Sequence, residues 1–320
     1  PTKVLHSTAS RQGANMPFEL TQSDSLCVAK MKRALSNFET EEGRLSGLNY
    51  TPLLQDEVII TTSPKAGTTW LQQICHQLRS SGPEGDMSFD EISTAVPWLE
   101  LAFDQGQDLA APQLNQTSTN LRVWKSHAWE PDCPKGAKYI VVVRDPCDVA
   151  LSFYKFFENW FFEKDEISVD AFVQEFWLMR GIPESKMQNA SYFHHFLSWY
   201  RRKDDDDVLF LFFEDLKVDL KKEVAKIAAF ISNETWSCTD EASIEKATRM
   251  ASFEFMSLNS VKFNESLSKK ARNVACGLRE DAGMNDSKIK SGEAGGGKKR
   301  LGDDLKTMIG EKWVEVMQEE

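Results

Sequence analysis

Four short apolar runs, at residues 58–61, 121–124, 139–143 and 208–212, are the clearest feature of the hydrophobic pattern. Runs of this length without polar alternation are typical of strands that are buried on both faces of a sheet. Segments in which apolar residues recur at helical spacing lie between and after these runs. The alternation predicts an α/β fold: a single domain with a central parallel β-sheet flanked by helices.

The rest of the pattern predicts how this domain is organised. We expect residues 1–44 to form an N-terminal arm with the first elements, partly flexible, and residues 45–320 to form the domain. The run at 201–207 predicts a solvated turn, and the polar segment 264–297 predicts a long surface loop. A closing helix is expected at the end of the chain, with one side made of Leu305, Met308, Ile309 and Trp313.

The segment that follows the first strand predicts a cradle for a phosphate group. Gly67 lets the backbone come close to a ligand, and a helix that begins near Thr68 would point its unpaired N–H groups at an anion. The nucleotide P-loop has the order G-x-x-x-x-G-K-[ST], whereas here Lys65 precedes Gly67. This order counts against an ATP-dependent kinase or nucleotidase, which remains an alternative.

A second candidate site follows the third strand, which ends at Arg144. Asp145 is expected to cap the next helix and Pro146 to occupy its first position. The Arg144 guanidinium is suited to gripping a phosphate, and Ser152, about two turns into the helix, is placed to reach the same phosphate. The alternative for Arg144 is a salt bridge to Asp148.

The second strand delivers Lys125 and His127 to the same edge, because the carboxyl ends of parallel strands meet there. Histidine is the usual proton acceptor near neutral pH. We therefore predict that His127 is a general base beside the phosphate loop. A purely structural histidine is the alternative.

Composition narrows the possible partners. The 320-residue chain has a net charge of −11 and a pI near 5.1, which argues against binding to nucleic acid or to an anionic membrane. Neither a transmembrane helix nor a signal peptide is expected from the apolar pattern. The 6 cysteines show no paired or metal-like spacing. We expect free thiols, no metal site and a cytoplasmic location.

Together these blocks resemble the cytosolic sulfotransferase family. The family's cofactor loop, Tyr-Pro-Lys-Ser-Gly-Thr-Thr-Trp, stands here at 63–70 as Ser-Pro-Lys-Ala-Gly-Thr-Thr-Trp. Its Arg-Asn-Pro-x-Asp-x-x-x-Ser is similar to residues 144–152, and its Lys-Thr-His to residues 125–127. Weaker similarities lie at 209–217, 251–256 and 290–298. The resemblance covers roughly residues 45 to 315.

The resemblance implies that the cosubstrate is 3′-phosphoadenosine 5′-phosphosulfate (PAPS) and the product is 3′-phosphoadenosine 5′-phosphate (PAP). It implies transfer of the sulfuryl group by in-line attack of an acceptor hydroxyl or amine. The catalytic residues that it implies are His127, Lys65, Lys125 and Ser152. The cofactor-binding residues that it implies are Lys65, Ala66, Gly67, Thr68, Thr69, Trp70, Arg144, Ser152, Phe213, Ser252, Met256, Lys290, Ser291 and Gly292.

Several positions depart from the family pattern. Ala66 replaces a serine, Phe213 a tyrosine, Ser291 a lysine and Gly297 a tryptophan. Losing one charge-assisted contact costs about 1.5–3 kcal/mol, so a nearby cation at 298–300 is expected to compensate. The family's short dimer segment has no clean match in 264–290, and both a monomer and a homodimer stay open.

The acceptor is expected to be a small aromatic or hydrophobic molecule, because the expected walls of the acceptor pocket beside His127 are aromatic. Two further interpretations stay open beside the kinase. The chain is then either a weakly active relative of the sulfotransferases or a relative that binds PAPS or PAP without catalysis. The expected walls of the acceptor pocket are Trp98, Trp129, Phe153, Phe156, Phe157 and Trp160.

Overall fold

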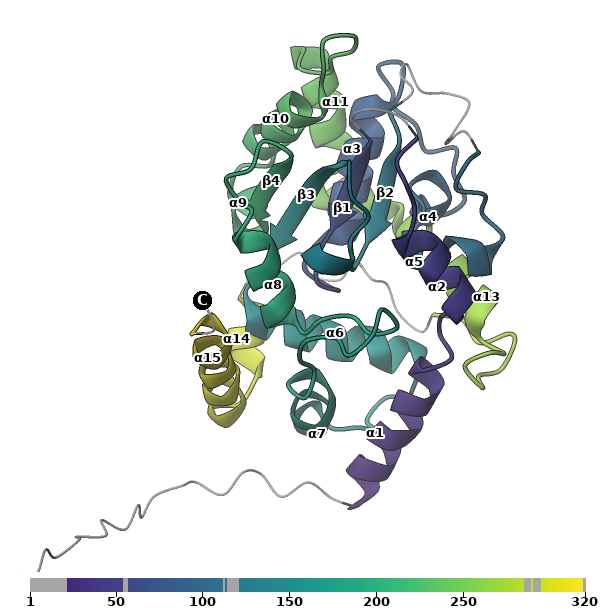
Figure 1. Ribbon diagram of the computed structural model, residues 1–320, viewed down its shortest axis with the longest axis vertical. Coiled ribbons are helices and arrows are strands. Elements are labelled where there is room, and N and C mark those ends of the chain that lie inside the picture. Colours follow the sequence, from purple (N-terminus) through teal and green to yellow (C-terminus); the bar gives the residue numbers. More distant parts are fainter. Residues whose placement is uncertain are drawn as a thin grey trace, which may run out of the picture.

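A four-stranded, all-parallel sheet forms the centre of the computed structural model, with the strand order β2-β1-β3-β4 (Figure 1). The structure describes residues 22–53, 57–111, 113, 121–284, 289 and 295–318. The predicted α/β fold and all four predicted strands are confirmed, although β2 lies two residues further along the chain than expected. The strands are β1 (Val58–Thr61), β2 (Val123–Ser126), β3 (Lys138–Val143) and β4 (Val208–Phe212).

Helices connect and cover the strands. The α-helices are α1 (Gln22–Leu35), α2 (Glu41–Leu48), α3 (Thr68–Arg79), α4 (Ile92–Ala95), α5 (Leu99–Ala102), α6 (Pro146–Trp160), α7 (Val169–Phe172), α8 (Tyr192–Tyr200), α9 (Phe213–Val218), α10 (Leu220–Ile231), α11 (Glu241–Met250), α12 (Phe253–Leu258), α13 (Ser266–Arg272), α14 (Gly296–Arg300) and α15 (Asp303–Met317). The other helical segments are η1 (Phe103–Gln105), η2 (Glu130–Asp132), η3 (Val173–Trp177) and η4 (Ser260–Phe263).

Both faces of the sheet are buried. Val58 and Ile60 point to one face, where they join the apolar sides of α3, α10 and α11 in one cluster. Ile59, which lies between them, points to the opposite face and joins a cluster that includes Tyr139 and Trp199. This arrangement explains why apolar residues follow one another without polar alternation along most of each strand, since successive side chains of a strand face opposite sides.

A layer of helices lies across the carboxyl ends of the strands. In Figure 1, α6 runs below the sheet, and α1 and α7 lie below α6. These helices share an aromatic core with α8 and α15. The predicted closing helix is confirmed as α15, in which Leu305 and Ile309 are buried and Trp313 packs against Phe196 at a centroid distance of 4.8 Å.

The prediction of a long surface loop at 264–297 was wrong for much of that segment. It contains α13 and the start of α14, and several of its polar residues are buried. Lys269 Nζ donates to the Asn159 carbonyl at 2.9 Å, and Arg272 Nε donates to the Phe38 carbonyl at 2.7 Å. These polar groups find partners inside the fold, so a polar sequence does not mark an exposed loop here. Within the described part of the chain, every helix is too short or too polar to cross a membrane.

Candidate active site

The loop between β1 and α3 has a strained backbone. Lys65 has a φ of 74° and Gly67 a φ of 130°. A Cβ atom at Gly67 would lie 3.0 Å from Cδ2 of Phe213, so this position requires glycine. A left-handed lysine costs on the order of 1 kcal/mol or more, and such strain is often found at ligand-binding sites.

Helix α3 begins directly after this loop. Its N-cap residue, Gly67, offers no side chain to the amide groups of the first turn. Thr68 and Thr69 line the cavity described below, and Thr68 Oγ1 is hydrogen-bonded to Thr62 Oγ1 at 2.5 Å. The amide groups and the dipole of this helix end favour an anion in the cavity.

His127 is held in one orientation. Its Nδ1 lies 2.8 Å from the Thr62 carbonyl oxygen, which can only accept, so Nδ1 carries a proton and, when the imidazole is neutral, Nε2 carries the lone pair. Its backbone N–H donates to Glu100 Oε1 at 2.7 Å. The Trp98 ring lies edge-on to the imidazole with centroids 5.0 Å apart. The histidine is thus placed to accept a proton at Nε2.

Lys125 lies two residues before His127 in the wall of the same cavity. Its ammonium group forms an ion pair with the carboxylate of Glu265 and lies 3.8 Å from the centroid of the Trp98 ring. Both charged residues are buried. Glu265 has a left-handed φ of 57°, immediately before α13. A buried lysine whose charge is balanced in this way is fixed in place.

Arg144 lies at the end of β3 and also lines the cavity. The salt bridge considered as its alternative role exists: Arg144 Nη2 lies 3.3 Å from Asp148 Oδ2. The guanidinium carbon lies 4.3 Å from the centroid of the Phe213 ring. Asp145 caps α6 as predicted by accepting from Cys147 N at 3.0 Å. Arg144 is therefore held by a carboxylate and a ring while it faces the cavity.

Asp148 also joins α6 to α14. Its carboxylate accepts from Gly295 N at 2.8 Å and from Gly297 N at 2.5 Å. A Cβ atom at Gly297 would lie 2.3 Å from the carbonyl of Cys147, so the tryptophan of the family pattern would not fit this backbone. Arg300, at the end of α14, lines the cavity and is the cation at 298–300 that reaches it.

One cavity of about 1020 Å³ brings most of the predicted site residues together. The predicted residues that line it are Lys65, Gly67, Thr68, Thr69, Trp70, Lys125, His127, Arg144, Ser152, Phe213 and Met256. Ala66 is buried and Ser252 caps α12 by accepting from Phe255 N at 3.2 Å, and neither is among the lining residues. Lys290, Ser291 and Gly292 lie outside the described residues.

The ring of Trp70 is fixed beside Phe213. Its Nε1 donates to the carbonyl of Ala251 at 2.7 Å, and its centroid lies 5.3 Å from that of Phe213. Met256 belongs to a neighbouring cluster against which Trp70 packs. The two rings and the thioether give this end of the cavity a surface suited to a flat, uncharged group.

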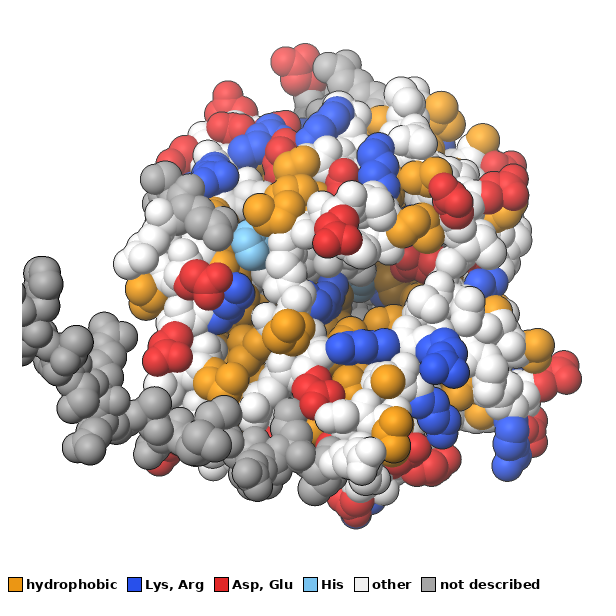
Figure 2. Space-filling view, turned by 60° about the horizontal axis from the view of Figure 1, so that its bottom comes forward, with side chains coloured by type: hydrophobic (Ala, Val, Ile, Leu, Met, Phe, Trp, Pro, Cys, Tyr) orange, Lys and Arg blue, Asp and Glu red, His pale blue; other side chains and the backbone are white. Residues whose placement is uncertain are grey.

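Aromatic side chains form the other end of the cavity. Five of the six predicted wall residues line it: Trp98, Phe153, Phe156, Phe157 and Trp160. Phe156 also lies 4.2 Å from Lys65 Nζ, measured to the ring centroid. Figure 2 shows hydrophobic side chains and lysine and arginine side chains together around a hollow on this face. This end is suited to an aromatic or hydrophobic molecule.

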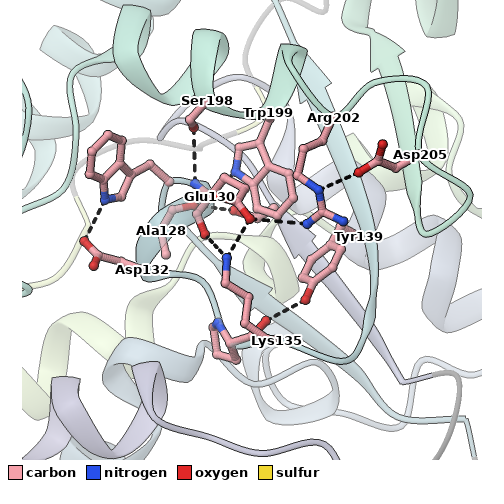
Figure 3. A network of polar contacts seen from close by, with 12 residues as sticks. Ala128, Glu130, Asp132, Lys135, Tyr139, Ser198, Trp199, Arg202 and Asp205 are labelled. Atoms are coloured by element: carbon pink, nitrogen blue, oxygen red, sulfur yellow. Dashed lines mark hydrogen bonds and ion pairs between the residues drawn. The ribbon is translucent and has the colours of Figure 1, made fainter.

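The prediction that Trp129 is a pocket wall was wrong. Its Nε1 donates to Asp132 Oδ2 at 2.6 Å in the segment η2, and Trp129 is not among the residues that line the cavity. The same region is anchored by Arg202, which lies 3.3 Å from Glu130 Oε1 and 2.7 Å from Asp205 Oδ2 (Figure 3). The turn predicted at 201–207 is confirmed. Arg202 of this turn has a structural role, because it holds Glu130 in the segment that follows His127.

The cysteines are free, and burial raises the pKa of the Cys75 thiol to about 12 and that of Cys147 to about 11. Thiols of this kind are mostly protonated at neutral pH and are poor nucleophiles. Among the described residues, His, Cys, Asp and Glu form no group of three suited to a metal ion.

Sequence reasoning missed three charged residues of the site: Glu100, Arg180 and Glu265. Glu100 holds the backbone of His127, and its own segment, α5, carries no recognisable motif. Arg180 and Glu265 line the cavity from segments that are distant in sequence from the motifs. In the sequence, a single charged residue outside a motif cannot be distinguished from a charged residue on the surface.

Comparison with known sequences places this site in context. The family described as "Sulfotransferase domain" matches residues 55–318. Sulfotransferase 1E1 of Homo sapiens is 30% identical over 211 residues, which are 64% of this chain and 67% of that protein. Sulfotransferase 1B1 of Canis lupus familiaris is 31% identical over 212 residues, again 64% of this chain and 67% of that protein.

Solved structures share the fold. Mouse sulfotransferase SULT7A1 complexed with PAP has a TM-score of 0.59 and 20% identity, with 88% of this chain and 92% of that chain covered. Retinol dehydratase in complex with androsterone and the inactive cofactor PAP has a TM-score of 0.63 and 18% identity, with 94% and 96% covered. At these sequence identities the comparison shows a shared fold and nothing further.

Proposed function

The chain belongs to the sulfotransferase family, and we propose that it transfers the sulfuryl group of PAPS to a hydroxyl or amine of a small aromatic or hydrophobic acceptor. The observation that carries this proposal is the convergence of three motifs on one cavity. The phosphate loop with Lys65, the strand end with Arg144, and the Lys125–His127 pair all line it. Two solved relatives of the same fold hold PAP.

The nucleotide occupies the end of the cavity next to α3. The first-turn amides of α3 and the hydroxyls of Thr68 and Thr69 bind the 5′-phosphosulfate. Arg144 and Ser152 bind the 3′-phosphate, with Arg300 as an additional cation. The adenine lies against Trp70 and Phe213. These roles match the cations and rings to the charged and flat parts of the nucleotide.

His127 is the general base of the transfer. The acceptor oxygen or nitrogen forms a bond to sulfur while the bond from sulfur to the bridging phosphate oxygen breaks. The acceptor proton moves to Nε2 of His127, and the electron pair of the broken bond stays on the 5′-phosphate of PAP. The hydrogen bond from Nδ1 to the Thr62 carbonyl supports this tautomer.

Lys65 and Lys125 provide the electrostatic stabilisation. Negative charge grows on the bridging oxygen during the transfer, and a fixed cation in a buried site stabilises it more strongly than water does. The buried position of Lys125 and the loop position of Lys65 support these roles. The aromatic side chains at the other end of the cavity place the acceptor beside His127.

Transfer of radiolabelled sulfate from PAPS tests this proposal. A panel of phenols, sterols and aromatic amines should include at least one acceptor that is labelled, and the labelling should require PAPS and no ATP. Tight PAP binding without labelling of any acceptor would instead support a non-catalytic relative. Labelling of sugars alone would contradict an aromatic acceptor.

A further inference from the structure

Arg180 lies at the acceptor end of the cavity, on its aromatic wall. The residue follows η3 and is one of the lining residues. Its guanidinium carbon lies 5.7 Å from the ring centroid of Phe153 and 5.9 Å from that of Phe176. Phe153 and Phe176 also line the cavity. A cation therefore stands among the aromatic residues that would contact the acceptor.

The hydrogen bonds of Arg180 leave its charge unbalanced. Its Nη2 donates to the carbonyls of Asn189 at 3.1 Å and Ala190 at 3.3 Å. No carboxylate within the described ranges forms an ion pair with it. Burial, together with the like charge of Arg44, lowers the pKa of Arg180 to about 10, so it remains a cation at neutral pH. Arg180 is half-buried, and a cation partly withdrawn from water without a counterion is costly, so a bound anion would relieve that cost.

Arg44 lies close enough to serve as a comparison. Its Nη1 lies 2.5 Å from Glu39 Oε2, its Nη2 donates to Asn189 Oδ1 at 2.7 Å, and its Nε donates to the carbonyl of Lys186. Arg44 is thus occupied by a carboxylate and by the segment 181–190. Both arginines hold this segment, but only Arg44 has a carboxylate partner from the chain itself.

The other charges of the lining do not supply a counterion for Arg180. Each of the three less exposed carboxylates has another partner: Glu39 pairs with Arg44, Asp148 with Arg144, and Glu265 with Lys125. Glu184 lines the cavity but is exposed to solvent. Lys155 adds a further positive charge to the lining. The acceptor end therefore combines aromatic surface with an excess of positive charge, although the chain as a whole carries a net charge of −11.

We propose that Arg180 binds a carboxylate on the acceptor. The acceptor is then an aromatic or hydrophobic acid that carries the carboxylate at one end of the molecule and the reacting hydroxyl or amine at the other, beside His127. This inference rests on the proposed function and names the acceptor class. The Nη2 group of Arg180 is held by the two carbonyls, and its other N–H groups can donate a charge-assisted hydrogen bond to a carboxylate, whose single negative charge balances that of the guanidinium. Phe153 and Phe176 pack against the body of the acceptor.

Matched phenols with different end groups test this inference. The set comprises 4-hydroxyphenyl acids with one to four methylenes, their methyl esters, and the corresponding amines. Binding to the protein, with and without PAP, is measured by calorimetry, and sulfate transfer from PAPS is measured in parallel. The variants are Arg180→Met, Arg180→Lys as the conservative change, and Lys30→Met, which removes an exposed cation outside the cavity.

For at least one linker length, the wild type should bind the acid about tenfold to a hundredfold more tightly than its ester, the range expected for a charge-assisted hydrogen bond. Arg180→Met should abolish this preference, so that the acid and the ester bind about equally. Arg180→Lys should retain part of it, and Lys30→Met all of it.

Equal binding of acid and ester by the wild type at every linker length, or preference for the amine, would overturn the inference. The comparison within the wild type does not depend on the folding of any variant. Acid-selective binding that requires Arg180, without any sulfate transfer, would support the carboxylate site and contradict the proposed enzyme. Equal sulfate transfer to the acid and to the ester would support the proposed enzyme and contradict the carboxylate site.

Discussion

Glu265 and Lys125 lie 140 positions apart in the chain and form a buried ion pair in the wall of the cavity. The pair joins the strand end that carries His127 to the residue that precedes α13. It connects the proposed catalytic lysine to a segment for which the sequence predicted only a loop.

Removing one member of this pair should destabilise the fold. Glu265→Gln leaves the ammonium of Lys125 buried without its counterion, and breaking a buried pair in this way costs about 3–5 kcal/mol. We expect the double variant Lys125→Met/Glu265→Gln to lose less free energy of unfolding than the sum of the two single variants. Urea denaturation of all four proteins measures this.

The exposed pair of Lys221 and Glu241 provides the control. Glu241→Gln should change the free energy of unfolding little, since exposed pairs are screened by water and salt. Additive effects of the two changes at 125 and 265 would contradict the ion pair.

Gly67 should tolerate no side chain. In Gly67→Ala the new Cβ meets the Phe213 ring and the backbone must keep a φ of 130°. We expect PAP affinity to fall by at least about tenfold, because the loop must shift relative to α3 by a few tenths of an ångström or more. Gly82→Ala is the matched control, since Gly82 has a φ of 83° with nothing within 4 Å of the added Cβ. Unchanged PAP binding by Gly67→Ala would show that the loop does not hold the nucleotide.

His127 should be needed for transfer and not for nucleotide binding. Removing the general base in His127→Gln should lower kcat by about 10²–10⁴-fold. The Kd for PAP should stay near that of the wild type, which also shows that the variant is folded. Steady-state kinetics with PAPS and calorimetry with PAP measure the two effects. A parallel loss of both would instead indicate a structural histidine.

His195 should make the fold sensitive to acid. Burial lowers the pKa of His195 to about 3, from an ordinary value of 6.5. The unfolded chain therefore binds a proton that the folded chain excludes below pH 6.5. The stability provided by the neutral imidazole is fully present above pH 6.5 and is lost as the pH falls from 6.5 towards 3.

This loss amounts to about 2 kcal/mol between pH 7 and pH 5 for one such group. His195→Gln should remove this contribution to the pH dependence of the free energy of unfolding, whatever its effect at pH 7. Urea denaturation at pH 7, 6 and 5 measures both proteins. Identical pH dependence would contradict a neutral buried His195.

The sheet and the phosphate loop could be predicted because their signals are local. A buried strand, a turn with Gly67 and a helix that begins at Thr68 follow one another within a few residues, and so do Arg144, Asp145 and Pro146. The carboxyl ends of parallel strands then bring these motifs to one edge. Local sequence thus determines both the elements and the place where their ends meet.

The parts that failed depend on which partners the side chains find in the folded chain, some of them near in the sequence and some distant. Trp129 follows the His127 motif closely, but its ring is held by Asp132 and does not line the cavity. The hydroxyl of Ser252 caps α12, and its binding of a phosphate stays a prediction. The polar sequence of α13 reads as a loop because its partners, such as the carbonyl of Asn159, lie far away in the chain.

The most direct test of the account is calorimetric titration with PAP, set against ATP and AMP, for the wild type and Arg144→Ala. We expect PAP to bind more tightly than ATP or AMP, and Arg144→Ala to lose about tenfold to a hundredfold in PAP affinity through the loss of a charge-assisted contact to the 3′-phosphate. Equal or tighter binding of ATP, or PAP binding that is unaffected by Arg144→Ala, would contradict the proposed nucleotide site.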